Sequence, residues 1–189
     1  MFRWLAVPLS VLVLTLASAA QADGLTFDGK LAEGHALYLA GDFEGAHKAY
    51  LEAKEMDSGR AEIYYYAGWA LVGLEKVDDA LASFGTAGTI AGSKDPALKG
   101  KALFSAAIVT EKNKDRAAAK EAWTEYLGFA QTNTDATVFV DVAKARIEAL
   151  EKVIKLEADY APVKEKMQGE GGSDQADQST GGVVLTTTE

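Results

Sequence analysis

The residues best suited to acid–base or metal chemistry are His35 and His47, since the chain has no cysteine. Imidazole can act as a general base or bind zinc, but both roles need a partner group held nearby. The two histidines fall on different predicted helices, and no spacing motif pairs either one with a carboxylate. We therefore expect no metal site, no cofactor and no general base.

Three glycines, Gly85, Gly88 and Gly92, have a spacing that suggests a phosphate-binding loop. No strand-like segment precedes them and no Gly-Lys-Ser/Thr follows, so the mechanism of such a loop is missing. We interpret them as the loosened end of a helix, where each glycine costs about 1 kcal/mol relative to alanine. The sequence also lacks serine-hydrolase and zinc-protease motifs, so we expect a protein that is not an enzyme.

The elements that position these residues are two matched segments, residues 34–53 and 68–87, which repeat at a constant offset of 34 residues. This period is typical of helix–turn–helix repeats. Small residues at the shared positions let helix backbones approach, and the shared aromatic fills the space between repeats. A third copy follows at an offset of 39 residues. The expected repeat-packing residues are Gly34, Ala46, Tyr50, Ala53, Gly68, Ala80, Phe84, Ala87, Ala119 and Trp123.

From about residue 27 to residue 130 the chain resembles the tetratricopeptide repeat (TPR) family. Lys30 and Glu33 depart from the pattern, because they stand where apolar residues are usual, and Tyr126 stands where a small alanine is expected. The third repeat also has no glycine at its turn. The second repeat meets the family pattern best, with Tyr64, Ala67, Gly68, Leu71, Ala80, Phe84 and Ala87.

The resemblance implies an all-α fold, a right-handed superhelical stack of three TPR-like repeats with a C-terminal capping helix. Residues 23–29 form a lead-in, residues 30–166 the helical domain, and residues 167–189 a disordered tail. We place the repeats at about 27–60, 61–94 and 97–132, and the capping helix at about 135–158, with a boundary at Pro162. The capping helix directs one apolar face toward the third repeat: Val140, Ala143, Ile147, Leu150 and Ile154. Helical periodicity predicts helices at residues 30–40, 43–56, 61–74, 77–90, 97–111, 116–130 and 135–158.

The family further implies a concave groove that binds a peptide or helix of another protein. Tyr65 and Trp69 lie one turn apart on one helix face, and such aromatics dominate binding energy at interfaces. Covering of this face by the chain's own C-terminal helix or tail is an open alternative. The expected groove residues are Leu31, His35, Tyr38, Tyr65, Trp69, Val72, Phe104 and Ile108.

Family members that clamp a C-terminal carboxylate use lysine, asparagine and arginine in this groove. Only Lys101 survives of that set in this chain. We therefore do not expect binding of chaperone tails. The other matching positions hold Leu31, His35, Tyr66 and Ser105.

Residues 1–22 have the layout of a secretory signal peptide, with Arg3, an apolar run over residues 4–17 and a small-residue end at residues 20–22. The run is short for a membrane span, which needs about 20 apolar residues. We expect cleavage before Asp23, no stable membrane insertion afterwards, and a periplasmic location, with secretion as the alternative.

Acidic residues dominate the chain: without Arg3, 28 acidic residues face 18 basic ones. Such a surface repels phosphate backbones, so we expect no nucleic-acid partner. The leading hypothesis is an exported TPR adaptor or scaffold that binds another cell-envelope protein. A self-associating structural subunit, which would form a homo-oligomer through the groove or the capping helix, is the alternative. An enzyme or small-ligand-binding protein is the third option.

Overall fold

The structure, a computed structural model, describes residues 26–170, and within this range the chain forms only helices. The predicted signal peptide, its cleavage site and residues 171–189 of the predicted tail lie outside it. The elements are α2 (Phe27–Leu39), α3 (Phe43–Met56), α4 (Ala61–Gly73), α5 (Val77–Ala91), α6 (Pro96–Lys112), α7 (Arg116–Thr132), the 3-10 helix η1 (Thr134–Phe139) and α8 (Val140–Glu170).

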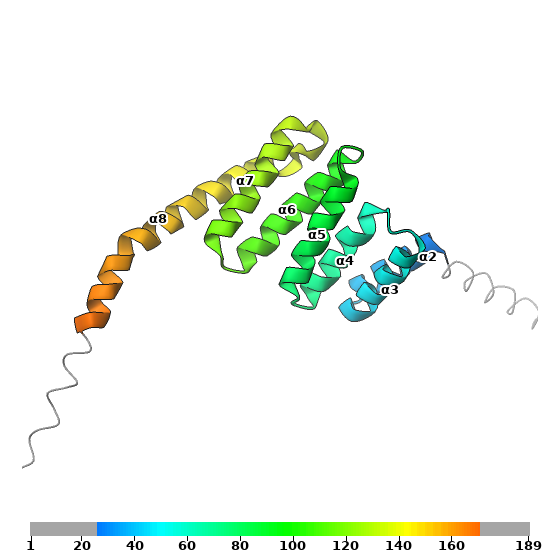
Figure 1. Cartoon of the computed structure of the whole chain (residues 1–189), viewed down its shortest axis with the longest axis horizontal. Coiled ribbons are helices and arrows are strands. Elements are labelled where there is room, and N and C mark those ends of the chain that lie inside the picture. Colours follow the sequence, from blue (N-terminus) through cyan, green and yellow to red (C-terminus); the bar gives the residue numbers. More distant parts are fainter. Residues whose placement is uncertain (1–25, 171–189) are drawn as a thin grey trace, which may run out of the picture.

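Figure 1 shows α2 to α7 as a row of antiparallel helices, each lying beside the next one in the chain. The first helices of successive repeats also contact one another, α2 with α4 and α4 with α6. This arrangement is a stack of three helix–turn–helix units, as the 34-residue period predicts. All ten expected repeat-packing residues are buried in it.

The turn between the two helices of each repeat places one residue in the left-handed region. Gly41 has φ 80°, Glu75 has φ 59° and Lys114 has φ 67°. These positions are separated by the same 34 and 39 residues that relate the repeats. The turn geometry is therefore conserved between the repeats even where glycine is absent, because tertiary packing of the two helices offsets a local cost of about 1–2 kcal/mol.

Aspartates cap the N-termini of three helices, α3, α6 and α7. Asp42, Asp95 and Asp115 each accept a hydrogen bond from the backbone amide three residues on, at 2.8, 2.9 and 3.0 Å. These bonds satisfy amide groups that have no partner inside the helix. Pro96, directly after Asp95, occupies the first turn of α6, where its missing N–H costs nothing.

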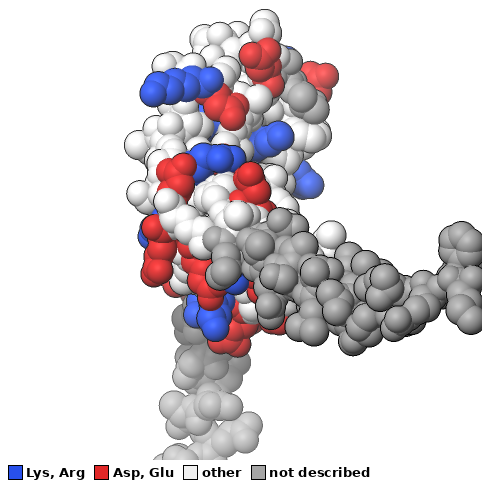
Figure 2. Space-filling model, turned by 90° about the vertical axis from the view of Figure 1, so that its right-hand side faces the viewer, with Lys and Arg blue, Asp and Glu red and all other residues white. Residues whose placement is uncertain are grey.

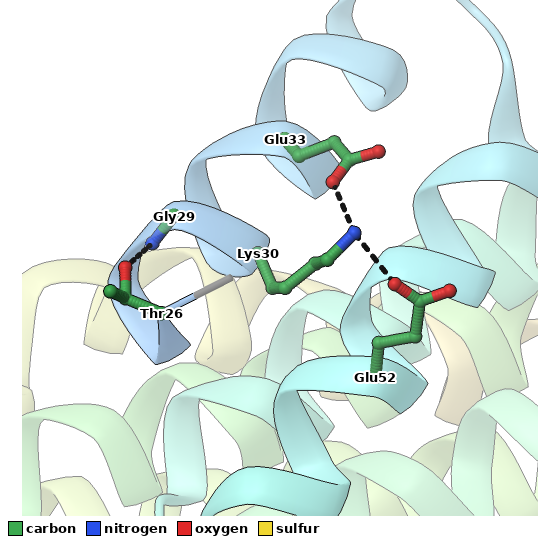
Figure 3. Close-up of polar contacts among 5 residues, drawn as sticks. All are labelled: Thr26, Gly29, Lys30, Glu33 and Glu52. Carbon is green, nitrogen blue, oxygen red and sulfur yellow. Dashed lines mark hydrogen bonds and ion pairs between the residues drawn. The ribbon is translucent and has the colours of Figure 1, made fainter. Parts of the chain in front are cut away.

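The first helix begins earlier than predicted, at Phe27 rather than at residue 30. Thr26 caps it, since the Gly29 amide donates to Thr26 Oγ1 at 3.0 Å (Figure 3). The unusual Lys30 and Glu33 are explained in the same view. Lys30 Nζ lies between Glu33 (2.8 Å) and Glu52 of α3 (2.7 Å), so an ion pair links the two helices at this point. Hydrogen bonds to Glu33 and to Glu52 raise the pKa of Lys30.

The C-terminal helix was predicted at residues 135–158, and this boundary is wrong at both ends. Residues 134–139 form η1 because Tyr126 at the end of the third repeat binds them: its hydroxyl donates to the Ala136 carbonyl (2.9 Å) and accepts from the Phe139 amide (3.3 Å). These two hydrogen bonds compete with the backbone hydrogen bonds that an α-helix would form over residues 134–139, so α8 begins only at Val140. The large Tyr126, where the family has alanine, thus joins α7 to η1.

At the other end, α8 continues through Pro162 to Glu170, so residues 167–170 of the predicted tail are helical. Proline removes one backbone hydrogen bond and displaces the preceding turn, which a helix can accommodate by bending. Figure 1 shows this bend in the orange part of α8. The predicted apolar face does pack on the third repeat: Ala143 and Leu150 are buried, and Val140 and Ile147 pack against the same cluster.

Candidate functional site

Tyr65 and Trp69 of α4 form an aromatic ridge between two adjoining cavities, and both residues line each cavity. The ridge is anchored from behind by Phe84 of α5, which is buried. Trp69 meets the Phe84 ring edge-on at 5.5 Å between centroids, and Tyr65 meets it at 6.0 Å. Both ridge residues are therefore partly buried, with one side in the repeat core and the other facing the cavities.

The first-repeat cavity, of about 540 Å³, lies on one side of this ridge. His35 and Tyr66 meet there edge-to-face at 4.2 Å, and Tyr50 stacks on Tyr66 at 6.0 Å. Burial lowers the pKa of His35, so its imidazole is neutral at pH 7. Leu39 at the rim is 85% exposed. The cavity is thus aromatic and uncharged, and its lining is completed by Tyr38, Tyr65 and Trp69.

The third-repeat cavity, of about 400 Å³, lies on the other side of the ridge. Phe104 of α6 forms its centre and stacks on Phe139 of η1, with ring centroids 4.4 Å apart. Lys101 and Asp135 supply one charge of each sign and are both exposed. The remaining lining residues are Tyr65, Trp69, Ala97, Gly100, Ser105, Tyr126 and Ala136.

A further cavity of about 430 Å³ shares Phe104 with the third-repeat cavity and extends past Ile108 to the charged residues Glu111, Lys112 and Arg146, so the groove is apolar around the aromatic ridge and charged at this end. The three cavities are joined by shared lining residues, and together we call them the groove. It runs from His35 over the aromatic ridge to Ile108. An apolar groove of this extent suits a chain segment better than a small metabolite.

The structure places six of the eight expected groove residues on this groove: His35, Tyr38, Tyr65, Trp69, Phe104 and Ile108. Leu31 and Val72 line none of the three cavities. Leu31 packs against the core of the first repeat, and Val72 packs against the core around Phe84. Their positions on their helices therefore direct both side chains toward neighbouring helices and not toward the groove.

The lining residues that sequence reasoning missed include Leu39, Tyr66 and Phe139. Leu39 lies one helical turn after His35, so its spacing could have indicated it. Tyr66 was considered only as the counterpart of a carboxylate clamp. Phe139 gave no usable signal, because its position depends on the 3-10 helix that Tyr126 holds.

The alternative in which the chain's own C-terminal part covers the aromatic ridge holds only for the wall of one cavity. η1 contributes Asp135, Ala136 and Phe139 to the wall of the third-repeat cavity. α8 packs against α7 and η1, and its residues Val142 and Arg146 line the cavity beyond Ile108. The groove on both sides of Trp69 therefore stays open within residues 26–170.

No metal centre accompanies the groove in the described part of the chain. Residues 26–170 contain no group of three or more histidines and carboxylates arranged to hold a metal ion. None of their helices combines the length and apolar character that a membrane crossing requires. Figure 2 shows the end formed by α2 and α3, where acidic and basic side chains are interspersed.

Comparison with known proteins identifies the fold. No protein-family model and no curated protein sequence matches the chain. Solved structures do match: the TPR domain of Arabidopsis OM64 is 20% identical with a TM-score of 0.52, over 67% of this chain and 94% of that one. The TPR2B domain of yeast Sti1, solved in a complex with pHsp70, is 20% identical with a TM-score of 0.56, over 67% and 96%.

The Yersinia enterocolitica type III secretion translocator chaperone SycD is 16% identical with a TM-score of 0.57, over 68% of this chain and 85% of that one. At these identities the likeness defines the fold alone. The chain is therefore an all-helical protein with a TPR fold, and the groove is the feature of that fold on which a function can be argued.

Proposed function

We propose that this protein is a non-enzymatic adaptor that binds an apolar segment of another protein in the groove. The observation that carries the proposal is the aromatic ridge: Tyr65 and Trp69 are anchored on Phe84, yet each faces both cavities. Rigid aromatics of this kind bind with little loss of conformational freedom and are enriched among interface hot spots. The TPR2B domain of Sti1, which has the same fold, was solved in a complex with pHsp70.

The groove chemistry selects the kind of segment. A carboxylate clamp needs several cationic or amide groups that are free to bind the ligand, whereas His35 is neutral and Ser105 is 2% exposed. The cations of the groove share its lining with carboxylates: Lys101 lines the third-repeat cavity with Asp135, and Lys112 and Arg146 line the cavity beyond Ile108 with Glu111. We infer that the ligand contributes aliphatic or aromatic side chains, as an extended strand or an amphipathic helix does. A free C-terminal carboxylate is not required.

The proposed location is the periplasm, with secretion from the cell as the alternative, and the proposed partner is another protein of the cell envelope. Both rest on the signal-peptide layout of residues 1–22.

The test uses peptides selected from a random display library against the chain from Asp23 to Glu189. Binding of a selected peptide is measured by calorimetry for two matched variants, Leu39→Asp and Leu51→Asp. Both leucines are exposed, at 85% and 41%, but only Leu39 lines the groove. We expect Leu39→Asp to weaken binding at least tenfold and Leu51→Asp to leave it unchanged. Peptides that bind both variants and Trp69→Ala as tightly as the parent would overturn the proposal.

A further inference from the structure

The C-terminal part of α8 extends beyond the helical stack (Figure 1). Up to Gln168, Leu150 is the last buried residue of the helix and Ile154 is the last partly buried one. Every residue from Lys155 to Gln168 is exposed. About four helical turns of α8 therefore bury no residue against the stack, and Glu157 in this stretch forms an ion pair with Arg116 of α7.

This extension carries an apolar row that we call the α8 stripe. Its spacing alternates between three and four residues, which is the spacing of a two-stranded coiled-coil seam. Tyr160 and Met167 are 65% and 71% exposed, although large apolar residues are usually covered. The α8 stripe consists of Val153, Leu156, Tyr160, Val163 and Met167.

The α8 stripe is not a continuation of the face that packs on α7. That face runs through Leu150 and Ile154, and its next positions at the same spacing are Glu157, Ala161 and Lys164, so no large apolar residue follows Ile154 on it. The row of large apolar residues on the packed face thus ends at Ile154, and the α8 stripe lies on a different, exposed face. A helix whose only role was to cap the stack would not need the second row.

The exposed segment also needs support to stay helical. Isolated helices shorter than about 12–15 residues are marginal in water, and a proline inside a helix costs about 3 kcal/mol. Pro162 immediately precedes Val163 and lies off the α8 stripe, so its ring does not obstruct packing along the seam. Burial of the stripe against another helix would supply the missing stabilisation.

The charges beside the α8 stripe indicate what that helix is. In a parallel, in-register coiled coil of two identical helices, the seam residues occupy positions a and d of a seven-residue repeat labelled a to g. The residue just before each position a faces the residue five positions later in the other copy. With Val153 and Tyr160 at a positions, Lys152 of one copy faces Glu157 of the other. By the same rule, Asp159 of one copy faces Lys164 of the other. Both pairs are attractive and each occurs twice, so the segment is complementary to itself.

The present partners of these charges do not prevent such pairing. Lys152 contacts Glu148 at 2.6 Å and Asp159 contacts Lys155 at 2.7 Å, both on the same helix. Glu157 contacts Arg116 of α7. All six side chains are at least 44% exposed, so these contacts are weak. They can exchange with contacts to a second copy at little cost.

We propose that the exposed part of α8 binds the same segment of a second copy of this chain as a parallel two-stranded coiled coil over residues 153–167. Parallel pairing is favoured because it matches all five stripe residues with themselves while keeping both charge pairs attractive. In an antiparallel pair, the register that brings opposite charges together aligns Leu156 with Met167. The same register leaves Val153 opposite Glu170 and without an apolar partner. The dimer would carry two grooves, which would strengthen binding to a partner with two segments.

The oligomeric state of the chain from Asp23 to Glu189 is measured by sedimentation over a concentration series. We expect dimer to accumulate with concentration. The double variant Leu156→Asp with Val163→Asp should be monomeric throughout, whereas Ala158→Asp, on the outer side of the same helix, should dimerise like the parent. Helical circular dichroism and the melting of the stack check that each variant is folded.

A second measurement tests orientation, since the chain has no cysteine of its own. Under mild oxidation Leu156→Cys should form an interchain disulfide, because Leu156 faces its own counterpart in the parallel pair, and Ala158→Cys should not. Asp159→Lys should weaken the dimer, and adding Lys164→Asp should restore it. A parent chain that stays monomeric, a dimer that survives Leu156→Asp with Val163→Asp, or failure of the Leu156→Cys disulfide would overturn the proposal. Trp69→Ala should not alter dimerisation, which separates this interface from the groove.

Discussion

A Cβ atom built on Gly68 would lie 2.7 Å from Cε1 of Phe84, closer than real Cβ contacts come. Gly34 and Tyr50 show the same relationship 34 residues earlier in the chain. In the first two repeats the backbone of the first helix therefore rests directly on the aromatic ring of the second. This contact explains why the two helices of a repeat approach so closely.

The first prediction follows from this contact. Gly68→Ala should lower the free energy of unfolding by about 1–3 kcal/mol, because the added methyl group must displace the buried Phe84 ring. Gly85→Ala is the matched control, since a Cβ there meets nothing within 4 Å. It should stabilise the helix by up to about 1 kcal/mol. Urea unfolding of both variants checks the prediction, and equal effects of the two substitutions would contradict it.

The second prediction separates the aromatic ridge from the core. Phe84→Ala should cost about 3–5 kcal/mol of stability, because Phe84 is 1% exposed and its removal opens a cavity. Trp69→Ala should cost less, about 1–2 kcal/mol, since the indole is only partly buried and loses mainly its edge-to-face contact. Thermal melts measure both. If Trp69→Ala melts the protein as severely as Phe84→Ala, Trp69 is a core residue and the ridge is not a binding surface.

The third prediction concerns Glu111, which accepts a hydrogen bond from Trp123 Nε1 at 2.7 Å. Trp123 is 1% exposed, so its indole N–H has no access to water. Glu111→Ala should destabilise the third repeat by about 1–3 kcal/mol, the cost of a buried donor without a partner. Glu111→Gln should retain most of the stability because its amide oxygen can still accept. A Gln variant as unstable as the Ala variant would point instead to the contact between Glu111 and Arg146.

The fourth prediction is a dependence of stability on pH. Burial lowers the pKa of His35 below its usual value of 6.5, so between the folded and unfolded pKa values the unfolded chain binds more protons. The contribution of this group is complete above pH 6.5 and is lost as the pH falls toward the folded pKa. His47 acts in the same direction, through burial and then the charge of Lys76. The melting temperature should therefore fall between pH 7.5 and about pH 5.5.

His35→Gln tests this assignment, because glutamine does not titrate. The variant should show a smaller fall in melting temperature over the same range. Glu52 and Glu148 have lowered pKa values and lose their stabilising contribution only at more acidic pH. An unchanged fall in both His35→Gln and His47→Gln would show that other groups cause it.

The fifth prediction concerns export. If residues 1–22 are a signal peptide, the intact mass of the protein recovered from a periplasmic extract should correspond to a chain that begins at Asp23. Replacing Ala20 and Ala22 with bulky residues should block this cleavage. A full-length mass in the membrane fraction of the parent would contradict the export hypothesis.

The sequence by itself determined the repeat register and the helical class. Gly34 and Gly68 pair with Tyr50 and Phe84 through short-range geometry. A close approach of two helices and an aromatic filler each need one residue type at one position. These requirements recur in the first two repeats, and they can be read from spacing alone.

Only the tertiary structure decided which side chains line the groove and where the last helix begins. Leu31 and Val72 have groove spacing but pack inward, and Phe139 joins the groove through the hydrogen bonds that Tyr126 makes with η1. These outcomes depend on contacts between residues from different elements, which no local pattern encodes.

The same distinction applies to α8. Two apolar rows with the same alternating spacing lie next to each other in the sequence, one ending at Ile154 and the other running from Val153 to Met167. The packing of α7 buries the first row and leaves the second exposed. Spacing can show that a helix has an apolar face, but which face is buried depends on where the neighbouring helix lies.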